Sequence, residues 1–344
     1  MLGRLVTAHR IRRVAQLGPT FVMLTSLVVA CADGVTPIGP DASLPPPPPQ
    51  GPSNPGPPPP TSPPARITGR VAFASDRSGS SWIYVADSIS VRPLVPGDEP
   101  AWSPDGAMIA FESGNGIGIV NADGTNERTI RSRGSQPTWS PDGTQIAFTD
   151  GGIRVMQADG SGDRTLVAAD FFQRDDVLGR PDWSADGQHI AFVRYDCCWM
   201  WPLEIYVVAL DGIRPRLAMN GVRENGGTVY YSHWSPSWAP DGRSIAFIHN
   251  FDLVTMATGA GVLKYVGTRA AWESRVDWSP DGRRLVFGDY NGSRERRTPP
   301  FTGPLRIYVA DVETGSVDRL IPEVDAPANL SYWDNNPAWS PSRR

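Results

Sequence analysis

The chain has 344 residues, a formal net charge of −4 and 20% charged residues. This composition is typical of a globular protein and provides no strong attraction to nucleic acid or to anionic membranes. We therefore expect no nucleic-acid partner, and we expect membrane contact only through an anchor if the chain carries one.

The first thirty residues have the pattern of an export signal. Four arginines between Arg4 and Arg13 precede a ten-residue, mainly apolar stretch at 21–30, FVMLTSLVVA. This stretch is too short to span a bilayer as a helix, and its position after a basic segment is typical of a secretory signal. It ends at Cys31 in a sequence that resembles a bacterial lipoprotein cleavage box, which predicts a lipidated Cys31. The alternative is cleavage after Ala32, which would discard Cys31 and release a soluble protein.

Prolines dominate the next segment, with runs at 45–49 and 57–60. Such a sequence forms an extended, semi-rigid spacer and cannot build a core. We therefore predict a signal peptide at 1–30, a lipidated cysteine with a disordered proline-rich linker at 31–65, and a folded domain at 66–344. The expected location is the bacterial periplasm or outer membrane as a lipoprotein, with a secreted soluble protein as the alternative.

A motif repeats through the folded domain: Trp-Ser-Pro-Asp-Gly, two or three variable residues, then Ile-Ala-Phe or a close variant. Copies begin at Trp102, Trp139, Trp183, Trp238 and Trp278, and a shortened copy begins at Trp339. Trp234-Ser235-Pro236 is not a copy, because the rest of the motif follows Trp238 instead. A repeat of about 40 residues is typical of propellers and other repeat architectures.

Each copy predicts a strand that ends at Trp, a tight turn and a second strand. Pro, Asp and Gly in sequence favour a hairpin turn, and Ile-Ala-Phe has the unbroken apolar character of a strand buried on both faces. A third apolar strand and a turn follow, so the unit is four antiparallel strands, a to d. Four strands per repeat predict a propeller blade.

The repeats predict an all-β, six-bladed β-propeller. Residues 71–73 read as a strand b with no Trp motif before it, whereas Trp339 ends a strand a with no strand b after it. Joined, these segments would form a sixth blade shared between the N- and C-terminal ends, which would remove two open sheet edges.

The long connections of the propeller all fall between strands b and c or between d and the next a. In a propeller these connections share one face, here called the long-loop face, and the Ser-Pro-Asp-Gly turns occupy the opposite short-turn face. Aromatic and arginine side chains on rigidly positioned loops favour binding. The predicted binding face comprises Trp199, Trp201, Tyr230, Tyr231, His233, Trp234, Arg294, Arg296, Arg297, Tyr332 and Trp333.

The adjacent Cys197 and Cys198 lie in one of these loops. In an oxidising compartment they can form a vicinal disulfide or remain free thiols. No further Cys or His stands at the spacing of metal ligands, so we predict no metal site and no cofactor. The motifs of hydrolases, zinc proteases and nucleotide-binding enzymes are also missing. We therefore expect a monomeric binding module for a protein or cell-envelope partner, not an enzyme.

An alternative is a carbohydrate-binding or carbohydrate-active propeller, a lyase or hydrolase with its site at the channel mouth. It would use acids such as Asp182, Asp277 or Asp334. Asp182 and Asp277 precede Trp in predicted innermost strands, where they could face the channel and hold a cation, or simply face water.

The Trp-Ser-Pro-Asp-Gly and Ile-Ala-Phe pattern resembles the TolB-like propeller repeat family over about residues 100–344, together with the strands at 70–87. The resemblance implies a six-bladed propeller. The family includes an envelope protein that binds partner proteins, propellers fused to serine peptidases, and sugar-acid lyases. This chain has a proline-rich linker where the envelope protein has an α/β domain, so the resemblance does not imply a role in that system.

Overall fold

The computed structural model describes residues 67, 69–88, 90–172, 177–195, 202–212, 214–219, 233–249, 252–258, 262–269, 275–290, 305–320 and 334–341. The chain divides into two units, Met1–Pro55 and Gly56–Arg344, and every described residue belongs to the second. Among the described residues, no helix has the length and apolar character needed to cross a bilayer. The predicted signal peptide, Cys31 and the proline-rich linker lie outside these ranges.

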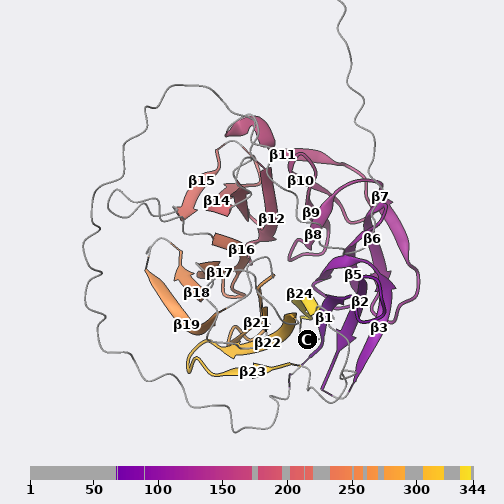
Figure 1. Ribbon diagram of the computed structural model, residues 1–344. Helices are drawn as coiled ribbons and strands as arrows, with labels where there is room; N and C mark the ends of the chain where they lie inside the picture. Colours follow the sequence, from indigo (N-terminus) through magenta and orange to yellow (C-terminus); the bar gives the residue numbers. More distant parts are fainter. Residues whose placement is uncertain are drawn as a thin grey trace, which may run out of the picture. The chain divides into compact units, whose positions relative to one another are not determined.

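The described chain forms six four-stranded antiparallel sheets, as Figure 1 shows. Blade 1 contains β4 (Asp98–Trp102), β5 (Met108–Ser113), β6 (Gly116–Asn121) and β7 (Arg128–Arg131). Blade 2 contains β8 (Ser135–Trp139), β9 (Gln145–Thr149), β10 (Gly152–Gln157) and β11 (Arg164–Ala168), and is followed by the 3₁₀ turn η1 (Ala169–Phe171). Blade 3 contains β12 (Val177–Trp183), β13 (His189–Tyr195), β14 (Pro202–Ala209) and β15 (Arg216–Met219).

The remaining three sheets complete the ring. Blade 4 contains β16 (His233–Trp238), β17 (Ser244–His249), β18 (Asp252–Ala257) and β19 (Leu263–Arg269). Blade 5 contains β20 (Asp277–Trp278), β21 (Arg284–Tyr290), β22 (Leu305–Asp311) and β23 (Val317–Arg319). Blade 6 has the order β24-β1-β2-β3, with β24 at Asp334–Trp339, β1 at Val71–Ser75, β2 at Trp82–Ala86 and β3 at Val91–Pro96.

The six innermost strands form a closed ring, so the predicted six-bladed propeller is confirmed. Neighbours in this ring contact one another in the order β4, β8, β12, β16, β20, β24 and back to β4. In blade 6, β24 pairs antiparallel with β1, with Val71 opposite Trp339 and Ala72 opposite Ala338. The yellow β24 accordingly lies beside the indigo β1 in Figure 1.

The core consists of six apolar clusters, one between each pair of neighbouring sheets. The second strand of each blade is therefore buried on both faces, as the unbroken Ile-Ala-Phe runs predicted. In β5, Ile109 and Phe111 pack toward blade 6 while Ala110 packs toward blade 2, and all three are fully buried. The blades thus stabilise one another, because an isolated sheet would leave both of its apolar faces exposed to water.

The repeated turn satisfies its own polar groups. In blade 1, the Asp105 carboxylate accepts hydrogen bonds from the Ser103 hydroxyl (2.6 Å) and the Ala107 amide (3.0 Å). These bonds lower the pKa of Asp105, with the Ser103 bond the largest cause. Gly106 has a φ of 66°, a left-handed conformation that glycine adopts without strain.

Candidate functional site

The strand order fixes which face each connection leaves. Each innermost strand runs toward the short-turn face and ends at the motif Trp, so the next strand starts there and ends at the opposite face. The connections 196–201, 220–232, 291–304 and 321–333 therefore all join strands at their long-loop ends. The described strand ends on both sides of each predicted long loop therefore lie at one face of the ring.

Most of the predicted binding residues lie outside the described ranges. This applies to Trp199, Trp201, Tyr230, Tyr231, Arg294, Arg296, Arg297, Tyr332 and Trp333, and also to Cys197 and Cys198. His233 and Trp234 begin β16, where they pair with His249 and Ile248, and their backbones are described but their side chains are not. Their roles as ligand contacts stay predictions.

The innermost strands share a distortion that sequence reasoning missed. Glu99, Gln136, Arg180, Ser235 and Asn336 each stand three residues before the motif Trp and directly before a proline, and each has a positive φ between 49° and 55°. The register of pairing shifts at the same point in each of these strands. Such bulges redirect side chains. The signal was available as an X-Pro-x-Trp pattern within the repeat.

The redirected side chains meet in a polar layer. Arg180 Nη1 lies 2.8 Å from Glu99 Oε2 and 3.2 Å from Asn336 Oδ1, and the Arg180 amide donates to Gln136 Oε1 at 2.9 Å. Asn336 in turn donates to Asp98 at 3.0 Å. This layer therefore links the inner strands of blades 1, 2, 3 and 6 through hydrogen bonds that each involve at least one side chain.

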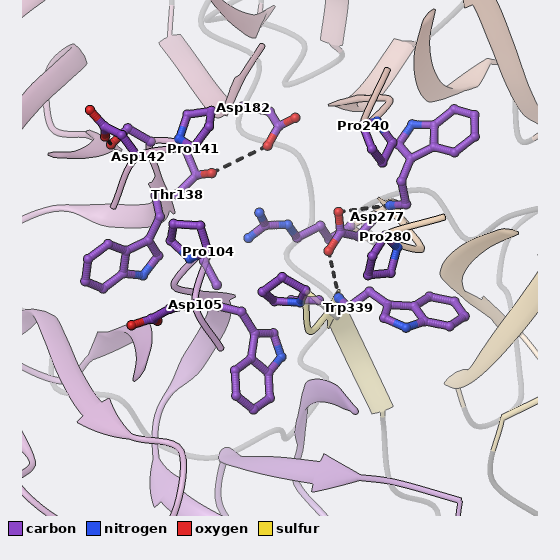
Figure 2. A pocket seen from close by; sticks show the side chains of 18 residues that line it. Pro104, Asp105, Thr138, Pro141, Asp142, Asp182, Pro240, Asp277, Pro280 and Trp339 are labelled. Atoms are coloured by element: carbon purple, nitrogen blue, oxygen red, sulfur yellow. Dashed lines mark hydrogen bonds between the residues drawn. The ribbon is translucent and has the colours of Figure 1, made fainter. Parts of the chain in front are cut away.

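A cavity of about 940 Å³ opens among the turns of the short-turn face (Figure 2). Its lining combines turn prolines and aspartates with motif tryptophans and with the residues just before them. The lining comprises Ala101, Trp102, Pro104, Asp105, Thr138, Trp139, Ser140, Pro141, Asp142, Asp182, Pro240, Arg275, Asp277, Trp278, Pro280, Ala338, Trp339 and Pro341.

Asp182 and Asp277, which line this cavity, connect neighbouring blades and so do more than face water. Asp182 Oδ2 accepts a hydrogen bond from the backbone amide of Trp238, in the next blade, at 2.7 Å. Asp277 Oδ2 accepts one from the Trp339 amide in blade 6, also at 2.7 Å. Figure 2 shows the bond between Asp277 and the Trp339 amide, and it also shows Asp182 beside the Thr138 hydroxyl, 3.4 Å away. Asp334 is different: it is fully buried and paired with Arg77 at 2.6 Å.

Burial raises the pKa values of two acids, Asp182 and Glu112. It is the largest cause raising the pKa of Asp182 to about 7, partly opposed by the Arg275 guanidinium. Burial also raises the pKa of Glu112 to about 7, with Glu99 and Asp98 adding to the effect. Among the residues that the structure covers, no three Asp, Glu, His or Cys side chains come together as potential metal ligands. The acids of the channel serve here mainly as hydrogen-bond acceptors and ion-pair partners.

No protein-family model matches the chain. A region of 142 residues, 40% of this chain, is 32% identical to an uncharacterized protein of Agrobacterium fabrum. The match spans 40% of that relative's length.

Solved structures share the fold at low sequence identity. TolB of Acinetobacter baumannii superposes with a TM-score of 0.62 at 18% identity, covering 81% of this chain and 68% of that one. A chain of a nidogen–laminin complex gives 0.58 at 13% identity over 80% and 99%. An oligogalacturonate lyase in complex with manganese gives 0.50 at 15% identity over 76% of each chain. These neighbours establish a TolB-like propeller fold.

Proposed function

We propose that this chain is an exported, lipid-anchored propeller that binds a protein or another cell-envelope component through its long-loop face. The observation that supports this most is that the strand ends bordering all four long connections lie at one face of the ring, whereas the fully described connections at the other face are short turns. Loops held by a rigid scaffold are the usual place for binding residues. Two fold neighbours fit this class: one is TolB, and the other comes from a complex between two proteins.

The test compares capture by the full chain and by two variants. Replacing Trp199, Trp234 and Trp333 with Ala removes three aromatic groups from the proposed face, and aromatic anchors dominate many interfaces. The matched control replaces Val262 and Tyr265 with Ala, because both are exposed (71% and 56%) beside or within the outer strand β19.

We expect an envelope partner, cross-linked and identified with the wild-type chain, to bind the control equally. Its affinity for the triple Trp variant should fall at least tenfold, while circular dichroism of the two variants stays the same. Equal affinity of all three proteins would contradict a binding role for this face. Metabolic labelling with a palmitate analogue tests the anchor: the label should be present on the wild type and lost in Cys31→Ala.

The carbohydrate-active alternative draws support from the cavity that contains Asp182 and Asp277 and from the fold it shares with an oligogalacturonate lyase. Incubation with oligogalacturonate, followed by ultraviolet absorbance of unsaturated products, tests lyase activity. Formation of product that is lost in Asp182→Asn would favour this alternative over the binding module.

A further inference from the structure

The short-turn cavity carries an excess of negative charge. Its lining contains Asp105, Asp142, Asp182 and Asp277, and its one positive side chain is that of Arg275. Burial raises the pKa values of Asp182 and Asp277, and the Arg275 guanidinium opposes this effect at both carboxyl groups. The positive charge of the lining is therefore already associated with Asp182 and Asp277.

The other two acids, Asp105 and Asp142, stand in the exposed turns of blades 1 and 2. Hydrogen bonds lower their pKa values, and the largest cause is the Ser103 hydroxyl for Asp105 and the Ser140 hydroxyl for Asp142. Both side chains are therefore carboxylates at neutral pH. They give this part of the cavity its negative charge.

The repeated turns differ in the residue that follows the glycine. In blades 4 and 5 this residue is an arginine, Arg243 or Arg283, which places a positive charge in the same turn as the aspartate. In blades 1 and 2 it is Ala107 or Thr144, which are uncharged. The turns of blades 1 and 2 therefore carry an aspartate without an arginine of their own.

Blade 6 places the end of the described chain beside the turn of blade 1. The Ser340 amide donates to the Arg70 carbonyl at 2.7 Å, and the Arg70 amide donates to Ser340 Oγ at 2.8 Å. Pro341 follows in the cavity lining, and a β-carbon at Gly106 would lie 3.7 Å from the Pro341 carbonyl oxygen. Arg70 Nη2 donates to the Gly106 carbonyl at 2.8 Å, which also holds this turn against blade 6. The chain therefore leaves Pro341 next to the turn that contains Asp105.

The residues that follow Pro341 are Ser342, Arg343 and Arg344, which lie outside the described ranges. This segment has two positive charges and no acidic side chain, so its charge is opposite to that of the cavity. An extended chain advances about 3.3–3.6 Å per residue, so three residues reach roughly 10 Å before an arginine side chain is added. Attachment at the cavity also gives the segment a high effective concentration there.

We propose that residues 342–344 dock in the short-turn cavity of their own chain, where Arg343 and Arg344 form ion pairs with Asp105 and Asp142. Exposed ion pairs are individually weak and are screened by salt, so this docking depends on the attachment of the segment beside the cavity. The docked segment holds the end of β24, the strand that closes the ring, and competes with other cationic groups for the cavity. The docking is on the face opposite the long loops, and it does not depend on the proposed function.

Chemical cross-linking tests the contact directly. Lys264 is the only lysine in the chain and stands in the outer strand β19, so Arg344→Lys adds one amine at the proposed contact. Carbodiimide treatment of the full chain should join this amine to Asp105 or Asp142 through an amide bond, which mass spectrometry of the peptides identifies. Arg216→Lys is the matched control, because Arg216 is exposed on the outer strand β15, and it should give no link to these two acids.

An isotope mixture shows which chain supplies the docked segment. Equal amounts of ¹⁵N-labelled and unlabelled Arg344→Lys protein should give cross-linked peptides that are wholly heavy or wholly light. The yield should fall in about 0.5 M sodium chloride, because salt screens the ion pairs. Peptides that combine the two labels, or a yield no higher than that of the Arg216→Lys control, would overturn the proposal.

Removal of the two charges provides a second measurement. In the variant with Arg343→Gln and Arg344→Gln, the Trp339 amide should exchange hydrogen roughly two to five times faster, because the end of β24 is held less firmly. The control variant with Arg214→Gln and Arg216→Gln, two exposed arginines, should exchange at the wild-type rate. The difference should disappear in about 0.5 M sodium chloride. Exchange at the wild-type rate in the first variant at low salt would refute the docking.

Discussion

Asp277→Ala should loosen the attachment of β24 to the ring. The substitution leaves the amides of Trp278 and Trp339 without their acceptor, and hydrogen bonds to a charged group contribute roughly 1.5–3 kcal/mol each. The stabilisation that these two hydrogen bonds provide is offset in part, because burial raises the pKa of Asp277 and thus disfavours its charged form. We expect a net loss of about 2–4 kcal/mol in the free energy of unfolding. For a folded domain of about 280 residues, with an unfolding entropy of about 2.1 cal/mol/K per residue, this corresponds to a decrease of roughly 3–7 °C in Tm.

The assay combines urea denaturation at pH 7 with hydrogen exchange of the Trp339 amide. Exchange of this amide should accelerate more than that of β5, because the lost bond holds only the innermost strand of blade 6. Asp241→Ala is the matched control, since Asp241 is exposed and accepts one turn amide, from Arg243 at 2.9 Å. Its cost should stay below about 1 kcal/mol. If Asp277→Ala is no more destabilising than this control, the bond across the blades does not hold the ring.

Two further predictions concern the buried charges. The folded pKa of Asp182, about 7, lies above its unfolded value near 4, so the folded protein retains this proton as the unfolded protein loses it. The stabilisation from the raised pKa of Asp182 is therefore complete below about pH 4 and is lost as the pH rises to about 7. In Asp182→Asn, the urea midpoint of unfolding should depend less on pH over this interval than in the wild type. Parallel pH profiles for the two proteins would contradict the raised pKa of Asp182. Arg180→Ala leaves the buried Glu99 carboxylate without its partner and should cost about 3–5 kcal/mol in urea denaturation. Adding Glu99→Gln should recover more than 1 kcal/mol of that loss, and a double variant as unstable as the single would refute the pairing.

The repeat made the fold predictable, because its chemistry is local. Trp, the Pro-Asp-Gly turn and the apolar strand recur at similar spacing, and each copy reports the same strand-turn-strand unit. The two incomplete copies, at 71–73 and at Trp339, also predicted which segments pair in blade 6. These patterns can be read from the sequence because each turn forms its hydrogen bonds among neighbouring residues of the same repeat.

The channel could not be predicted in the same way. Arg180 and Glu99 stand in different blades, 81 positions apart in the chain, and only the bulge before each proline brings their side chains together.

By itself, the sequence determined the number of blades, the strand order and the face to which each connection belongs, because these follow from short-range turn chemistry repeated along the chain. Only the tertiary structure decided that Asp182 and Asp277 join neighbouring blades. These bonds are set by the packing of the blades into a ring, which places residues 56 or 62 positions apart in the chain within hydrogen-bonding distance.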